Sequence, residues 1–145
     1  MAGLVCVDAS LVLQVLLPDA RTPEVDGLWD AWSAQETDLV SPPLFFAEVT
    51  SVLRLQVHLR RIEAEFGERA FSLFMRMRVR VVSPPDLQPR AWALAKEHGL
   101  PRAYDAQYLA VADSLACELW TADGRLARAV RVPWLRLVGA EPPAA

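Results

Sequence analysis

The sequence predicts an α/β protein in which helices cover both faces of a central, mostly parallel sheet of four to five strands, a three-layer α/β/α arrangement. Short apolar runs, consistent with strands buried on both faces, alternate along the chain with longer segments of helical periodicity. Such alternation is typical of strand–helix–strand units with parallel strands. The 145 residues are enough for one core and too few for two. We therefore expect a single domain over residues 1–139 and a frayed tail over residues 140–145.

The strands are expected where apolar runs are short and end at a turn or a breaker. Leu4–Val7 is the first such run, and Ser83-Pro84-Pro85 ends another. The five expected strands are Leu4–Val7, Leu39–Val40, Val79–Val82, Glu118–Thr121 and Trp134–Val138.

The first helices are expected where prolines and capping residues bound a helical pattern. Leu11–Leu17 is closed by Pro18, and a second helix is opened by Thr22-Pro23-Glu24, with Thr22 as its cap. The second helix should turn four apolar residues inward, namely Val25, Leu28, Trp29 and Trp32.

Two longer helices are expected in the middle of the chain. One opens at Ser41-Pro42-Pro43 and runs to about Arg60. Its predicted apolar face consists of Leu44, Ala47, Ser51, Val52 and Leu55. The next helix carries apolar residues at roughly fourfold spacing, namely Ile62, Phe66, Ala70, Phe74 and Met77.

Three further helices are expected in the second half of the chain. Asp86 is predicted to cap a helix that runs through His98 and stops at Gly99 and Pro101. The other two are Tyr104–Ala116 and Gly124–Val130.

Composition argues against membrane, secreted and zinc-binding classes. No apolar run approaches the roughly 20 residues of a membrane span, and the N-terminus lacks the basic region of a signal peptide. We therefore expect a cytoplasmic protein without a membrane partner. Cys6 and Cys117 sit in apolar segments and are interpreted as buried thiols, and no His/Cys spacing suggests a zinc site.

Charge is unevenly distributed along the chain, although the net charge is only −3. Residues 54–80 contain seven arginines and three glutamates, a local charge of +4. This cluster is either a solvated helix face or a surface for phosphates or a partner.

Four acidic residues occupy positions where functional groups gather in parallel sheets. Asp8 and Asp123 directly follow predicted strands, Asp105 opens a helix, and Glu48 lies in the second turn of an apolar helix. Taken singly, the aspartates could be caps or turn residues and Glu48 a surface residue. Together, four carboxylates at one edge would repel one another unless a cation neutralised them. Oxygen ligands of this kind suit Mg²⁺ or Mn²⁺.

Short motifs around these acids resemble those of PIN-domain nucleases, and within them the VapC-type toxins of bacterial toxin–antitoxin pairs. The resemblance covers residues 4–138. Its pieces are Val7-Asp8-Ala9-Ser10, Phe46-Ala47-Glu48-Val49, Tyr104-Asp105-Ala106-Gln107 and Thr121-Ala122-Asp123-Gly124-Arg125-Leu126. Gly124 stands where the family often has a second basic residue, and Leu126 occupies a core-like position. These departures from the family pattern bear on how the substrate is recognised and leave the four acids unchanged.

The resemblance implies a metal-dependent endoribonuclease. It assigns metal coordination and catalysis to Asp8, Glu48, Asp105 and Asp123, and it places Ser10 and Thr121 near the metal, where they could instead be capping or turn residues. One or two Mg²⁺ or Mn²⁺ ions would activate water and stabilise charge on the phosphate. Arg102 and Arg125 would rim the site and contact phosphates, unless they are ordinary surface residues. A small antitoxin and a second copy of the chain, as a homodimer, are the implied partners.

Other functions remain open from the sequence. A haloacid-dehalogenase-type phosphatase needs a second acid two residues after Asp8, where this chain has Ser10. A histidine-based nuclease is disfavoured because His58 and His98 are interpreted as surface residues. A PIN nuclease of RNA processing or DNA repair, and a catalytically silent PIN-fold binding module, stay as alternatives.

Overall fold

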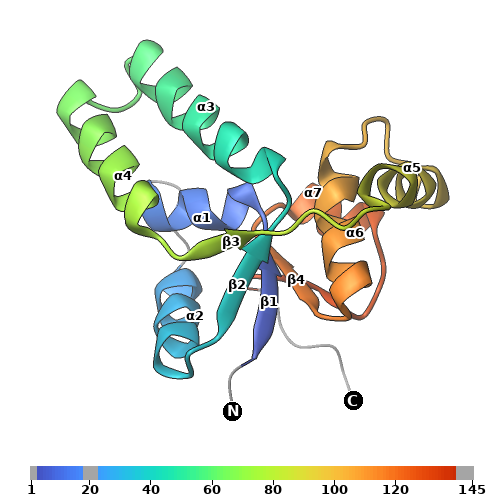
Figure 1. Cartoon of the computed structure of the whole chain (residues 1–145). Helices are drawn as coiled ribbons and strands as arrows, with labels where there is room; N and C mark the ends of the chain where they lie inside the picture. Colours follow the sequence, from blue (N-terminus) through green and yellow to red (C-terminus); the bar gives the residue numbers. More distant parts are fainter. Residues whose placement is uncertain (1–2, 18–22, 140–145) are drawn as a thin grey trace.

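A single parallel sheet organises the computed structural model, which describes residues 3–17 and 23–139. In that part of the chain five strands lie in the order β3-β2-β1-β4-β5 (Figure 1), and every neighbouring pair is parallel. They are β1 Leu4–Val7, β2 Asp38–Ser41, β3 Val79–Val81, β4 Glu118–Thr121 and β5 Leu135–Leu137. The predicted α/β class and parallel sheet are therefore confirmed.

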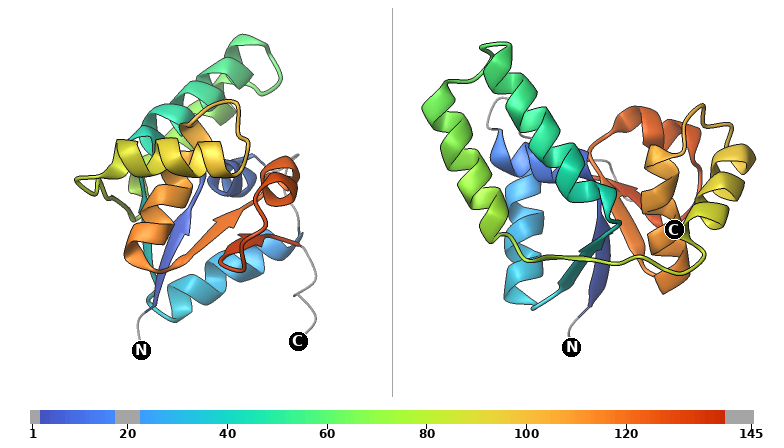
Figure 2. Two further views of the ribbon diagram at one scale, coloured as in Figure 1. Left: turned by 90° about the vertical axis from the view of Figure 1, so that its right-hand side faces the viewer. Right: turned by 45° about the horizontal axis from the view of Figure 1, so that its top comes forward.

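Helices cover both sides of this sheet. They are α1 Ala9–Leu16, α2 Pro23–Ala34, α3 Leu44–His58, α4 Ala64–Arg76, α5 Leu87–Glu97, α6 Tyr104–Leu115 and α7 Gly124–Ala129. Both figures of the whole chain show α1, α2 and α4 on one side and α5 and α6 on the other (Figures 1 and 2). The hairpin of α3 and α4 extends away from the sheet. Three layers result, as the alternation of elements predicts.

β1, the middle strand, lies in the core. Cys6 and Val7 of β1 are completely buried, as are Leu11 and Val12 of α1. The helix α6 packs against β1, and half of its buried residues are alanines. A strand covered on both faces reads as an apolar run, which is why the sequence located β1 correctly.

The apolar face predicted for α3 is wrong. The buried residues of α3 are Phe45, Val49 and Leu53, whereas Ala47, Ser51 and Leu55 are exposed. The ring of Phe45 packs on that of Phe74 in α4, with centroids 5.7 Å apart. Because α3 carries apolar residues on two faces, periodicity alone could not identify the one that this contact buries.

The apolar stripe predicted for α4 is confirmed in its central part. Ala70 and Phe74 are buried and Phe66 is partly buried. A Cβ added at Gly67 would collide with the side chain of Val57, so α3 and α4 lie close together there. Glycine at this position lets the two helices pack as a hairpin.

Several predicted boundaries need correction. Asp86 occupies the cap position of α5, but its carboxylate accepts a hydrogen bond from Arg90 at 2.9 Å and makes no capping bond. The first helix begins at Ala9, earlier than predicted, because Asp8 caps it. Three expectations, on Pro18, on Thr22 and on the tail 140–145, lie outside the described residues. Among the helices described, none has the length and apolar character needed to cross a membrane.

Candidate metal and active site

The carboxylate of Asp8 lies at the end of the central strand and is 4% exposed. Its Oδ1 accepts hydrogen bonds from the backbone N–H of Leu11 at 3.0 Å and from the hydroxyl of Ser10 at 2.7 Å. Its Oδ2 accepts from the hydroxyl of Thr121. Asp8 therefore does cap the helix, which was the alternative interpretation. A cap, however, requires neither a buried carboxylate nor a third hydrogen-bond donor.

Ser10 and Thr121 join the ends of β1 and β4. The backbone N–H of Ala122 donates to Ser10 Oγ, and that of Asp123 donates to Thr121 Oγ1, each at 3.0 Å. The two hydroxyls therefore hold Asp8 and also fix the turn that leads to Asp123. The expectation that both hydroxyls lie beside the acids agrees with these contacts.

Glu48 reaches the same region from α3. Its Oε1 accepts a hydrogen bond from the hydroxyl of Tyr108 in α6 at 3.2 Å. Tyr108 is buried, so this bond fixes the carboxylate between two helices. The sequence interpretation did not identify Tyr108. A signal was present, because Tyr108 lies three residues after Asp105 and shares its face of the helix.

Asp105 and Asp123 complete the set from α6 and α7. Asp105 lies in the first turn of α6, and the cap position belongs to Ala103, so the reading of Asp105 as a cap is wrong. Asp123 does cap its helix, accepting from the backbone N–H of Arg125 at 2.9 Å. A carboxylate gains at both places from the positive end of the helix dipole.

The four acids lie in one another's electrostatic field. The pKa of Asp8 is raised to about 6: burial raises it most, hydrogen bonds from Thr121, Ser10 and the backbone of Leu11 oppose the rise, and the charge of Asp105 adds to it. Burial also raises the pKa of Glu48, with Asp105 and Asp8 adding to the effect and the hydrogen bond from Tyr108 opposing it.

Asp105 links Asp123 electrostatically to the other acids. Its pKa is raised by burial and by the charge of Asp123, and lowered by Arg125. Asp105 is thus close enough to interact electrostatically with each of the other three carboxylates. That these four acids form one metal and catalytic site stays a prediction.

A divalent cation fits the donor chemistry of this cluster. All four groups are carboxylates, the oxygen ligands that Mg²⁺ and Mn²⁺ prefer, and a cation would relieve their repulsion. In residues 3–17 and 23–139, however, no three His, Cys, Asp or Glu side chains already form a group that could hold an ion. The acids share a field and do not form a closed coordination shell.

The two arginines predicted to rim the site differ in their surroundings. Arg125 is exposed, its Nε lies 3.8 Å from Asp123 Oδ1, and its charge lowers the pKa of Asp105. Arg102 is exposed on the loop before α6 and makes no ion pair with any described residue. Both therefore offer positive charge to solvent near the acids.

Other titratable residues lie outside the acidic cluster. Asp113 pairs with Arg90 at 2.8 Å. His58 is exposed, but the surface interpretation of His98 is wrong because its side chain is only 15% exposed. Cys6 is a buried free thiol, whereas Cys117 is only partly buried.

Comparisons with known proteins agree with this arrangement. The family model described as PIN domain matches residues 5–132. VapC ribonuclease Mb0985 of Mycobacterium bovis is 34% identical over 123 residues, which cover 85% of this chain and 88% of that protein. The crystal structure of Mycobacterium tuberculosis VapC20, described as a Sarcin-Ricin loop cleaving toxin, superposes with a TM-score of 0.64 and 22% identity, covering 91% and 98% of the two chains. VapBC2 of Rickettsia felis, bound to a DNA fragment from its promoter, gives a TM-score of 0.63 and 11% identity over 92% and 96%.

Replacing Asp8 by asparagine is expected to stabilise the metal-free protein at neutral pH. The pKa of Asp8 rises from 3.8 to about 6 on folding, so the folded state holds the proton more tightly and stability falls as pH rises between these values. The difference corresponds to about 3 kcal/mol at pH 7. Asp8→Asn, a neutral mimic of the protonated form, should show its advantage at pH 7 and lose it at pH 4.

The measurement is denaturant unfolding in the presence of a chelator from pH 4 to pH 8. Asp38→Asn, which removes an exposed carboxylate at the start of β2, serves as the matched control for the loss of one negative charge. If the difference in unfolding free energy between wild type and Asp8→Asn does not change with pH, the raised pKa of Asp8 is contradicted.

Proposed function

The chain belongs to the PIN domain family, and from this premise we propose that it is a divalent-metal-dependent endoribonuclease, the toxin of a VapC-type toxin–antitoxin pair. The observation that carries the proposal is the buried carboxylate of Asp8, held at the end of the central strand within the field of Asp105. The relative named VapC ribonuclease, similar along most of its length, supports RNA as the substrate. The same similarity favours the toxin over a nuclease of RNA processing or DNA repair.

We propose that Asp8, Glu48, Asp105 and Asp123 hold Mg²⁺, or Mn²⁺ in its place. The ion would lower the pKa of a water molecule and place positive charge opposite the developing charge on the phosphate. With a pKa of about 6, Asp8 is mostly ionised at pH 7.5, as a ligand must be. Burial keeps this carboxylate away from competing water.

The remaining residues of the site position these carboxylates and the substrate. Ser10 and Thr121 orient Asp8, and the Tyr108 hydroxyl orients Glu48, so neither carboxylate has to be ordered when the ion binds. Arg125 and Arg102 would contact phosphates on either side of the bond to be cleaved. Their charges offset the repulsion between RNA and the acidic cluster.

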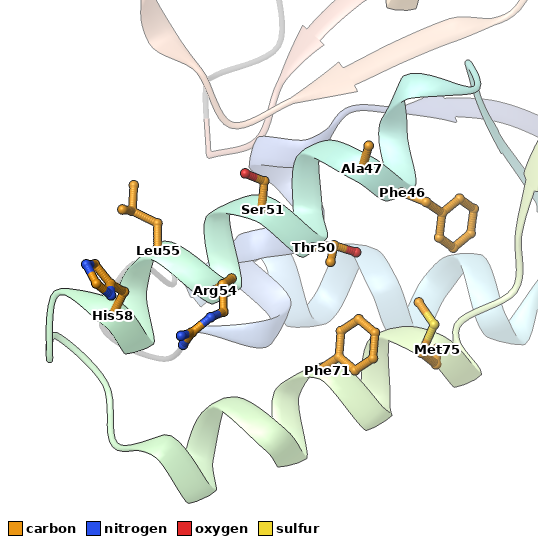
Figure 3. Close-up of a pocket in the computed structure, with 9 residues that line it drawn as sticks. All are labelled: Phe46, Ala47, Thr50, Ser51, Arg54, Leu55, His58, Phe71 and Met75. Carbon is orange, nitrogen blue, oxygen red and sulfur yellow. The ribbon is translucent and has the colours of Figure 1, made fainter.

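The hairpin of α3 and α4 supports the antitoxin as a partner. Between its helices lies an apolar groove (Figure 3), lined by Phe46, Leu55, Phe71 and Met75, with Arg54 and His58 toward the end of α3. A small protein that covers this groove would bury exposed apolar surface. Residues 54–80 carry a charge of +4, so an apolar segment with acidic residues is the partner that fits.

Two expectations from the sequence stay predictions. The homodimer can be checked by light scattering of the purified protein, where a mass near twice 16.1 kDa is expected. A cytoplasmic location can be checked by fractionating cells that produce the chain.

Asp105→Asn is expected to lower RNA cleavage by a factor on the order of 100 or more, because it removes one negative charge from the set that holds the ion. The assay follows degradation of total RNA in Mg²⁺ or Mn²⁺, with and without a chelator. Asp113→Asn is the matched control, since it changes the same residue type on the same helix in a salt bridge to Arg90.

The proposal fails if Asp105→Asn cuts RNA at the wild-type rate. The proposed need for a divalent metal is contradicted if excess chelator leaves wild-type cleavage unchanged.

Leu55→Glu is expected to weaken inhibition by the antitoxin without lowering cleavage in its absence. The side chain is 48% exposed at the groove, so the protein should still fold with glutamate there. The glutamate would place a charge in the apolar contact with the antitoxin. The product of the adjoining reading frame is titrated into the RNA assay, and a loss of affinity on the order of 30-fold is expected. Leu59→Glu, at a residue 46% exposed outside the groove, is the control. Equal inhibition of Leu55→Glu and wild type would remove the groove as the antitoxin site.

A further inference from the structure

An exposed aromatic residue begins α6, beside one of the four acids in the chain. Tyr104 is the first residue of α6, directly before Asp105, and it is 62% exposed. Within the described residues its hydroxyl makes no hydrogen bond and its ring packs on no other ring. Neither the positioning of the acids nor the core of the fold uses this side chain.

The helix places Tyr104 on the Glu48 side of the cluster. Residues four apart in an α-helix share a face, so Tyr104 lies one turn before Tyr108 along the same side of α6. Tyr108 donates its hydroxyl hydrogen to Glu48, which identifies the side concerned. Tyr104 therefore lies on this side of α6, one turn closer to the helix start than the tyrosine that holds Glu48.

The ring of Tyr104 is expected to extend toward the start of α6, where it is open to solvent. Long side chains in a helix lean toward its N-terminus. The N-terminus of α6 also bears Asp105, and Arg102 lies on the loop just before it. An aromatic ring open to solvent thus lies at the same end of α6 as a carboxylate of the cluster and an exposed arginine.

We propose that Tyr104 is the platform on which an unpaired base of the RNA stacks beside the phosphate that is cleaved. The inference rests on the proposed ribonuclease function and adds a residue that positions a base beside the cleaved phosphate. Every base has a π-face, so stacking on an aromatic ring accepts many sequences, but bases inside a duplex cannot reach such a ring. Arg102 and Arg125 would hold the phosphates while Tyr104 sets the position of the base.

Stacking can be separated from charge with two probes that carry the same phosphates. One is a fluorescein-labelled ten-nucleotide oligoadenylate, and the other is the same backbone with all bases removed. Both are titrated in chelator, where the proposed cleavage stops, and binding is followed by fluorescence anisotropy. Wild type should bind the oligoadenylate more tightly by a factor on the order of 10.

Variants of Tyr104 should change this preference and little else. Tyr104→Ala should bind both probes equally, with unchanged dependence on salt, whereas Tyr104→Trp should keep the preference. Trp92→Ala is the matched control, because it removes a ring that is 72% exposed on α5. In the cleavage assay Tyr104→Ala should raise KM on the order of 10-fold with a smaller change in kcat, since stacking acts on the bound RNA.

The outcomes separate this inference from the function on which it rests. Wild type that binds the two probes equally, or binds neither, overturns the platform, as does Tyr104→Ala with the wild-type preference and KM. Loss of the preference in Trp92→Ala would also overturn it. If metal-dependent cleavage persists in any of these cases, the nuclease proposal stands without the platform; if Asp105→Asn cleaves like wild type, the nuclease proposal itself fails.

Discussion

The buried carboxylate of Asp8 is the constraint around which the rest of the site is arranged. It lies at the end of β1, the middle strand of the sheet, which pairs with β2 and with β4. Burial of a negative charge at this place is unfavourable, and even three hydrogen bonds leave the pKa of Asp8 near 6. A protein optimised for stability alone would place a neutral side chain here, so the cost indicates a functional requirement for the charge.

The elements around Asp8 supply the other charges at fixed positions. The helix α6 packs against β1 and carries Asp105 at its start and Tyr108 one turn later, and Tyr108 in turn reaches Glu48 on α3. Thr121 ends β4, contacts Asp8 and positions Asp123. The site is therefore built on rigid strand ends and helix starts. Its acids come from four separate stretches of sequence that only the parallel sheet brings together.

The sequence predicted the fold well because strands and helices leave local patterns in the chain. Buried strands read as apolar runs, and Asp8 and Asp123 follow such runs directly. The apolar face of α3 could not be predicted, because Leu55 and Leu53 are equally apolar and only the packing of Phe45 on Phe74 selects between them. The role of Tyr108 was missed for a similar reason: its partner Glu48 is 60 residues away in the chain.

The most direct test of the account is the binding of Mn²⁺ to the purified chain at pH 7.5, measured by titration calorimetry. If the four carboxylates form a cation site, wild type binds saturably and Asp8→Asn binds at least about 10-fold more weakly, even though that variant is the more stable protein without metal. Equal affinity of the two proteins for Mn²⁺, or no binding by wild type, would contradict the account.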